Sequence, residues 1–191
     1  MGNVRNILPG RDFGNAVELW SSGIAGLNPS NIGPPYAARQ PHVAPWTANA
    51  LEVHAGIDVG GRLAAAIHAG PTLEYVAALL PQVEARVITD QGVAEIMTRC
   101  IQIQELAVHP DHRGQGHGAA LIAEVEDRAR HAGVFSLNGF VDLRNDSTGF
   151  YRRLGYTVLA PNTPIPPDVL LGLPTVHVPL WDGNWFYKVL G

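Results

Sequence analysis

Lysine and cysteine are almost missing from this sequence of 191 residues. Lys188 is the only lysine among 13 basic residues, and Cys100 is the only cysteine. A single cysteine excludes an intrachain disulfide, and because it stands in an apolar run before a strand pattern we interpret it as buried filler. A phosphate-binding loop of the GxxxxGK[ST] type needs a lysine, and no such motif is present.

Strong positive charge and long apolar runs are missing as well. The net charge of −4 argues against a general nucleic-acid binder, which usually carries a basic face. No apolar run approaches the roughly 20 residues that span a bilayer, and the first residues, MGNVRNILPGRDFGN, lack the apolar core of a signal peptide. We therefore expect a cytoplasmic protein without nucleic-acid or membrane partners, folded as one domain over residues 1–191.

Hydrophobic periodicity and turn residues predict a mixed α/β domain. The predicted elements are a helix at 11–22, a hairpin at 51–70 that turns at Gly60-Gly61, a strand at 101–108, a helix that ends at Gly133, a strand at 135–141, a short helix at 145–156, a strand from Tyr156 to Leu159 and a final hairpin that turns at Asp182-Gly183. Residues 72–99 fit a strand or a helix. Two proline-rich loops, 26–46 and 160–174, are long enough to carry function.

Three glycines alternate at the start of the predicted central helix, in the stretch HPDHRGQGHGAALI that follows the strand at 101–108. The first turn of a helix has unpaired N–H groups and a partial positive charge, and glycine lets a phosphate approach the backbone closely. A tight turn would need only one of Gly114, Gly116 and Gly118. The pattern therefore favours an anion site, with Arg113 beside it.

A dinucleotide-binding loop is one alternative. Gly114, Gly116 and Ala119 fit GxGxxG/A, and Asp142 follows a later strand as that motif asks. Two features oppose it: the polar HPDHR separates the strand from the first glycine, and the residues after Asp142 are too few for the rest of a doubly wound sheet. A nicotinamide-dependent oxidoreductase stays open as an alternative function.

ELAVHPDHRGQGHGAALI resembles the acetyl-CoA-binding motif of the GCN5-related N-acetyltransferase (GNAT) family. Arg113, Gly116 and Gly118 meet the family pattern Gln/Arg-x-x-Gly-x-Gly/Ala, and FYRRLGY at 150–156 resembles the second family signature. The resemblance is firm over residues 101–160. It implies a central, mostly antiparallel sheet that splays in the middle and is flanked by helices. It also implies transfer of an acetyl or longer acyl group from acetyl-CoA to a primary amine by direct attack.

The same resemblance implies the cofactor-binding residues. The pyrophosphate of acetyl-CoA would be held by the backbone of Arg113, Gly114, Gln115, Gly116, His117, Gly118 and Ala119. The pantetheine arm would pair with Leu106, Ala107 and Val108, and the Val108 N–H would polarise the thioester. Where the family often has an asparagine that contacts CoA, this sequence has Arg144, and Asn145 stands one residue away.

Proton transfer needs an acid and a base. Tyr151 matches the family position of the acid that protonates the departing thiolate, and a phenol is suited to that task. Glu105, on the motif strand, is our candidate for the base, while Gln102 and Gln104 would face the other side. His54 and His68, neighbours on the predicted hairpin, are weaker candidates. We expect no metal, because His109, His112 and His117 lack a ligand motif and are better interpreted as phosphate-side donors.

The amine itself is not named by any motif. In the family the acceptor lies between the two loops, where Tyr36, Trp46 and Trp181 are candidates to line its site. Asp168 is the only acidic residue of these loops, and this scarcity of negative charge argues against polycationic acceptors. A small-molecule or peptide amine is expected, and a homodimer is left open. A non-catalytic acyl-CoA-binding module remains a second alternative.

Overall fold

Seven strands form one sheet in the order β1-β2-β3-β4-β5-β7-β6 in the computed structural model. The structure describes residues 2–25, 27, 44–47, 49–71, 88–145, 147–172 and 182–191. The elements are β1 (Val4–Asn6), α1 (Arg11–Gly23), α3 (Ala44–Thr47), β2 (Val53–Val59), β3 (Arg62–Pro71), α5 (Asp90–Arg99), β4 (Cys100–Val108), η2 (Pro110–His112), α6 (His117–His131), β5 (Ser136–Asp142), α7 (Thr148–Arg153), β6 (Thr157–Val158), η3 (Pro167–Leu170) and β7 (Gly183–Val189).

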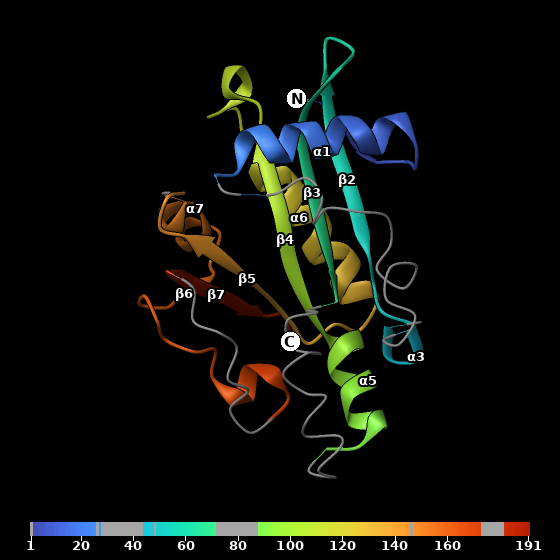
Figure 1. Cartoon of the computed structure of the whole chain (residues 1–191), viewed down its shortest axis with the longest axis vertical. Coiled ribbons are helices and arrows are strands. Elements are labelled where there is room, and N and C mark those ends of the chain that lie inside the picture. The colour runs from blue at the N-terminus through green and yellow to red at the C-terminus, as the bar shows by residue number, and fades with distance from the viewer. Residues whose placement is uncertain are drawn as a thin grey trace.

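The middle of the sheet is where its strands separate. All neighbouring strands are antiparallel except β4 and β5, which are parallel. These two strands pair only where Cys100–Ile103 of β4 lies beside Ser136–Gly139 of β5. Beyond these residues β4 continues to Val108 and β5 veers away from it (Figure 1). The mostly antiparallel, splayed sheet is thus confirmed. It is not the doubly wound parallel sheet that the dinucleotide alternative requires.

Helices cover both faces of this sheet, with α1 in front of the strands and α6 behind them in Figure 1. On the α1 face, Trp20 is fully buried against Ala66 and Ala107, and its indole Nε1 donates to the Ala66 carbonyl at 3.0 Å. On the α6 face, Leu121 and Ile122 pack on the alternate strand residues, Ile67 and Ile101 among them. Period-two alternation along β3 therefore assigns its even-numbered residues to the α1 face.

Most of the predicted elements are confirmed, including the hairpin, where Gly60 and Gly61 take positive φ angles of 59° and 77°. One helix is shorter than predicted, and another occupies part of the stretch that the sequence left ambiguous. The helix predicted over 145–156 is α7, only 148–153, and Ser147 at its N-cap makes no side-chain capping bond. In the ambiguous stretch, residues 90–99 form α5, because the Thr89 hydroxyl caps its first turn by accepting from the Gly92 N–H at 3.1 Å.

The proline-rich loops are described only in part. Residues 72–87, most of 26–46 and the first arm of the predicted C-terminal hairpin lie outside the described residues, as do Tyr36 and Trp181. In the 160–174 loop, η3 packs Val169 and Leu170 against α5. Cys100 lies in the same cluster, 1% exposed, and burial raises the pKa of its thiol to about 11. The interpretation of Cys100 as buried filler is confirmed.

Candidate active site

A cleft of about 670 Å³ lies where β4 and β5 part. It is lined by the unpaired end of β4, by the end of β5, by the first turn of α6 and by α7. Parted strands leave backbone N–H and C=O groups without a neighbouring strand. The cleft therefore offers hydrogen-bonding backbone along one wall and a helix N-terminus along another.

Glycine is required at the three alternating positions for two different reasons, backbone conformation and close packing. Gly114 and Gly116 have φ angles of 73° and 83°, a region that side chains other than glycine rarely adopt. Gly118 is helical, but a Cβ there would lie 3.3 Å from Cζ of Phe150, so its small size lets α7 approach α6 closely. Gly116 is the N-cap of α6 and brings no side chain to cap it.

The first turn of α6 consequently presents uncapped N–H groups. The Ala120 N–H donates to the Gly116 carbonyl at 3.0 Å, as the first bond of the helix. The N–H groups of residues 117–119 precede that bond and have no acceptor within the helix. They lie beside the cleft, where an anion would find them together with the positive end of the helix dipole.

His117, also in this first turn, is a buried polar residue. Its side chain lines the cleft and the residue is 4% exposed. Neither ring nitrogen has a hydrogen-bond partner among the residues that the structure describes. A buried polar group left in this way costs about 1–3 kcal/mol, so a ligand that reaches either nitrogen gains an interaction that the free protein lacks.

Nearly all of the residues predicted to bind the cofactor lie along the cleft. They are Leu106, Ala107, Val108, Arg113, Gly114, Gly116, His117, Gly118, Ala119 and Asn145. Gln115 is not among the described lining residues, because it turns back to donate to the Asp111 carbonyl at 3.2 Å. Arg144 is not among the described lining residues, but it bonds the carboxylate of Asp142, which is, at 2.6 Å and holds the pKa of that group at about 2.

Tyr151 lines the cleft from α7. Its ring stacks on Phe186 with centroids 3.7 Å apart, and only 6% of the residue is exposed. Burial raises the pKa of its phenol well above the usual value. The phenol therefore stays protonated at any physiological pH, as a general acid must before it donates.

Glu105 is displaced by a bulge that the sequence did not reveal. His68 pairs with Glu105 but the next residue, Ala69, pairs with Ile103, so Gln104 is an extra residue in β4. Glu105 therefore lies opposite His68 on the α1 face, whereas strict alternation would put it on the same side as Ile103. Gln104 lines the cleft, and Glu105 is absent from the described lining residues. The simple alternation assumed for Gln102, Gln104 and Glu105 is wrong.

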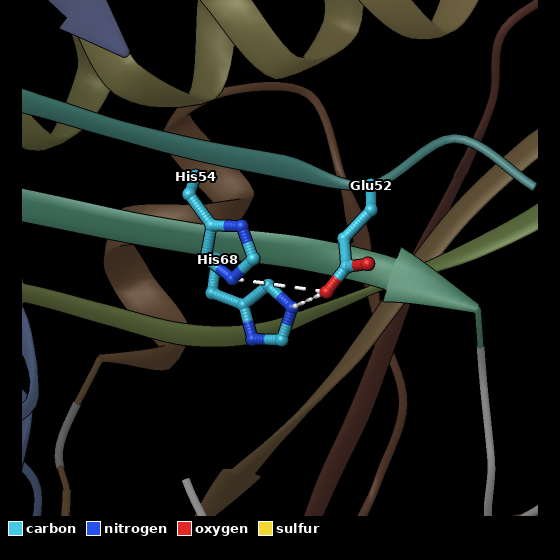
Figure 2. Close-up of side chains that lie close together, drawn as sticks. All are labelled: Glu52, His54 and His68. Atoms are coloured by element: carbon cyan, nitrogen blue, oxygen red, sulfur yellow. Dashed lines mark ion pairs between the residues drawn. The ribbon is translucent and has the colours of Figure 1, made fainter. Parts of the chain in front are cut away.

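A cluster of ionisable side chains surrounds His68 on the α1 face. His68 Nδ1 bonds Glu105 Oε2 at 2.7 Å, and its Nε2 lies 3.3 Å from Oε1 of Glu52. His54 stacks on His68 with ring centroids 4.3 Å apart, and its Nε2 lies 3.8 Å from the same Glu52 oxygen. Figure 2 shows both histidines directing a nitrogen at that one oxygen.

The two histidines of this cluster have opposite pKa shifts. Burial lowers the pKa of His68, but its hydrogen bonds with Glu105 and Glu52 outweigh burial and raise it to about 8. Burial, together with the nearby charge of His68, lowers the pKa of His54 to about 4. Their pairing across the hairpin was predicted. Glu52 was missed, although its place two residues before His54 puts it on the same side of the chain.

Trp46 is not among the described residues that line the cleft. Its indole Nε1 donates to Asp90 of α5 at 3.1 Å, and its ring packs with the cluster around Cys100.

Among the described residues no helix is long and apolar enough to cross a membrane.

Comparison with known proteins agrees with the geometry. Residues 33–156, more than half of the chain, match the model of the Acetyltransferase (GNAT) family. The chain belongs to the GNAT family. A GNAT protein of this kind is an acetyl-CoA-dependent N-acetyltransferase. The search of curated proteins found no match.

Solved structures share the GNAT fold over almost the whole chain. A ribosomal-protein-alanine N-acetyltransferase from Brucella melitensis has a TM-score of 0.58 at 14% identity, covering 98% of this chain and 99% of its own. A putative acetyltransferase from Salmonella typhimurium, solved with its cofactor acetyl-CoA, has a TM-score of 0.58 at 15% identity, covering 100% and 95%. A polyamine N-acetyltransferase from Drosophila melanogaster has a TM-score of 0.56 at 17% identity, covering 98% and 99%. At these identities the likeness concerns the fold.

Proposed function

We propose that this GNAT protein transfers an acetyl group from acetyl-CoA to a primary amine by direct attack, without a covalent enzyme intermediate. The observation that carries the proposal is the cleft between β4 and β5, which is lined both by the uncapped start of α6 and by Tyr151. One wall suits a pyrophosphate and the other carries a proton donor. The seven-stranded sheet takes strands from Val4 to Val189, which supports one catalytic domain over residues 1–191.

Acetyl-CoA would lie along the cleft with its pyrophosphate at the start of α6. The N–H groups of residues 117–119 and the ring of His117 are the donors for its oxygens. The pantetheine arm would pair with the unpaired edge of Leu106, Ala107 and Val108 in the manner of an added strand. The Val108 N–H would then meet the thioester carbonyl and stabilise the oxyanion that forms on it.

In the reaction the amine nitrogen attacks the thioester carbon, and the carbon–sulfur bond breaks. Tyr151 gives its phenolic proton to the departing thiolate and is reprotonated, through solvent, by the proton that the nitrogen loses as the amide forms. Before attack, an alkyl ammonium acceptor also has to give up a proton. We propose Glu105 as the group that takes this proton. It is next to Leu106 in the chain but faces the α1 side of β4, so the amine would approach from the side opposite the cofactor.

The acceptor is proposed as a small-molecule or peptide amine. The structural neighbours include enzymes described as acting on polyamine and on the alanine of a ribosomal protein, and one described as an agmatine N-acetyltransferase. An enzyme that consumes acetyl-CoA acts where that thioester is supplied, and we propose the cytoplasm for this one.

The test is release of free CoA thiol from acetyl-CoA in the presence of agmatine, spermidine and a peptide that begins with alanine. Binding is measured separately as thermal stabilisation by acetyl-CoA and by NADH. Acetyl-CoA at 100 times its Kd should add roughly 2.7 kcal/mol, a shift of about 5–10 °C, while NADH should add nothing. Stabilisation without thiol release from any amine would favour the non-catalytic acyl-CoA-binding module.

A further inference from the structure

Three side chains on the α1 face bring metal-ligand atoms to one point. Nε2 of His54, Nε2 of His68 and a carboxylate oxygen of Glu52 all lie within 4.8 Å of one another (Figure 2). We propose that Glu52, His54 and His68 bind a divalent transition-metal ion, with Zn²⁺ as the ion that their chemistry favours. This site is distinct from the acetyl-CoA cleft, and its assignment departs from our expectation that the chain binds no metal.

The strands hold these ligands in place. His54 and His68 are directly paired residues of β2 and β3. Glu52 immediately precedes β2, and its Oε1 lies 3.3 Å from His68 Nε2 and 3.8 Å from His54 Nε2. Paired strand residues cannot drift apart without breaking the backbone ladder. Two imidazoles and one carboxylate are also a usual set of three protein ligands for zinc with an open fourth position.

The distances fit an ion better than hydrogen bonds. Hydrogen bonds between nitrogen and oxygen cluster near about 2.9 Å, whereas Glu52 Oε1 lies 3.3 Å from His68 Nε2 and 3.8 Å from His54 Nε2. Tetrahedral zinc, with bonds of about 2.0–2.2 Å, separates its ligand atoms by about 3.4 Å. The rings are stacked with 11° between their planes, so the His54 ring would have to rotate for its Nε2 lone pair to point at the ion.

The second nitrogen of His68 already has the hydrogen-bond partner that a metal-bound histidine needs. Its Nδ1 is 2.7 Å from Glu105 Oε2, a true hydrogen-bond distance. A carboxylate on the far nitrogen fixes the tautomer of the imidazole and directs the lone pair of Nε2 to the ion. Glu105 is thereby a positioning residue for the proposed site.

Protonation of His68 is the competing explanation for the cluster. A charged His68 would satisfy Glu52 and Glu105 together, but it leaves His54 unexplained. His54 Nε2 is buried and has no hydrogen-bond partner among the described residues, although it faces the Glu52 oxygen. A cation is the occupant that satisfies Nε2 of both histidines and the carboxylate at once.

The surroundings suit a shielded ion. Phe13 meets the His54 ring edge-on at 5.3 Å and Trp20 lies 6.2 Å from the His68 ring. The side chains of Glu52 and His54 keep 21% and 13% of their surface exposed. The ion would thus enter from the Glu52 side, and a water molecule would complete its coordination.

The test is zinc binding by the full chain after chelator treatment, at about pH 8, because protons compete with the metal for its ligands at lower pH. Zinc content is measured after gel filtration, and affinity by competition with a chromophoric chelator. The variants are Glu52→Gln, His54→Gln, His68→Gln and Glu105→Gln, and His131→Gln is the control because its side chain is 78% exposed. Thermal stabilisation by acetyl-CoA is measured on every variant to show that its fold and cleft are intact.

We expect one zinc ion per wild-type chain and the same for His131→Gln. The ligand variants should weaken zinc binding by about 100-fold or more, and Glu105→Gln by about 10–100-fold, as for other outer partners of metal-bound histidine. Substoichiometric zinc in the wild type would overturn the site, as would unchanged affinity in His54→Gln and Glu52→Gln. Should His68→Gln fail to fold, Glu52→Gln decides, since that side chain is the most exposed of the three. A failure of the acetyltransferase proposal would show in the acetyl-CoA shift, independently of zinc.

Discussion

Nδ1 of His68 and Oε2 of Glu105 lie 2.7 Å apart across the ladder between β3 and β4, next to the bulge at Gln104. The bond joins the strand that carries the acetyl-CoA motif to the hairpin before it. Glu105 therefore lies on the proposed acceptor side of β4 and also contacts the cluster of Glu52, His54 and His68. The variants below separate these roles from one another and from simple stability.

Tyr151→Phe should lower kcat by about 10²–10⁴-fold, the usual contribution of a general acid. The ring that stacks on Phe186 remains, so the fold and the acetyl-CoA thermal shift should be kept. Steady-state kinetics and thermal melts make the comparison. Equal kcat in the two proteins would remove Tyr151 from the mechanism.

The burial of Tyr151 predicts how kcat of the wild-type enzyme depends on pH at alkaline pH. Burial raises the pKa of the phenol well above its usual value, so the acid form persists as the pH rises. We expect no loss of kcat attributable to this group between about pH 8 and 10, where an unshifted tyrosine would begin to ionise. A fall in kcat with a midpoint near 10 that is absent from Tyr151→Phe would contradict the assigned environment.

Gly114→Ala and Gly133→Ala are a matched pair. Their φ angles are 73° and 74°, and a Cβ at either position meets nothing within 4 Å. Both variants should lose about 1 kcal/mol of unfolding free energy from the left-handed conformation. Only Gly114→Ala, which lines the cleft, should raise the KM for acetyl-CoA. Equal KM values would place the pyrophosphate elsewhere.

His117→Leu should change stability and binding in opposite directions. The buried imidazole has no hydrogen-bond partner in the part of the chain that the structure describes, so its removal should leave the free protein as stable as the wild type or up to about 1 kcal/mol more stable. The loss of a donor to a charged phosphate should weaken acetyl-CoA binding by about tenfold or more. Urea unfolding and calorimetric titration measure the two effects, with His131→Leu as the exposed control. Lower stability with unchanged affinity would instead make His117 a packing residue.

Glu105→Gln keeps an oxygen that can accept from His68 but removes the base. We expect a loss of at least about tenfold in kcat with alkyl amines, which must be deprotonated before attack, and a much smaller loss with a weakly basic acceptor such as hydrazine. Glu95→Gln on the exposed surface of α5 is the control. A loss that is the same for both classes of amine would assign Glu105 to structure and leave deprotonation to another group.

Patterns within short stretches were sufficient for much of this molecule. The strand, glycine loop and helix of residues 101–133 are adjacent in the chain, and the φ angles and capping that they need are set by neighbouring residues. The acetyl-CoA motif and Tyr151 could therefore be placed from the sequence, and the resemblance to the GNAT family followed from them. The late start of α7 could not, because its N-cap lacks a capping bond while Asn145 instead accepts from the Ala25 N–H, 120 residues away.

Contacts between distant strands decided the rest. The bulge at Gln104 is a property of the pairing between β3 and β4, and it moves Glu105 to the α1 face, away from the side that alternation assigns to it. The pairing of His54 with His68 followed from the hairpin turn. The approach of Glu52 and Glu105 to that pair depends on three strands meeting in one register. Local periodicity carries no information on such register, since the hydrogen bonds that set it join residues far apart in the chain.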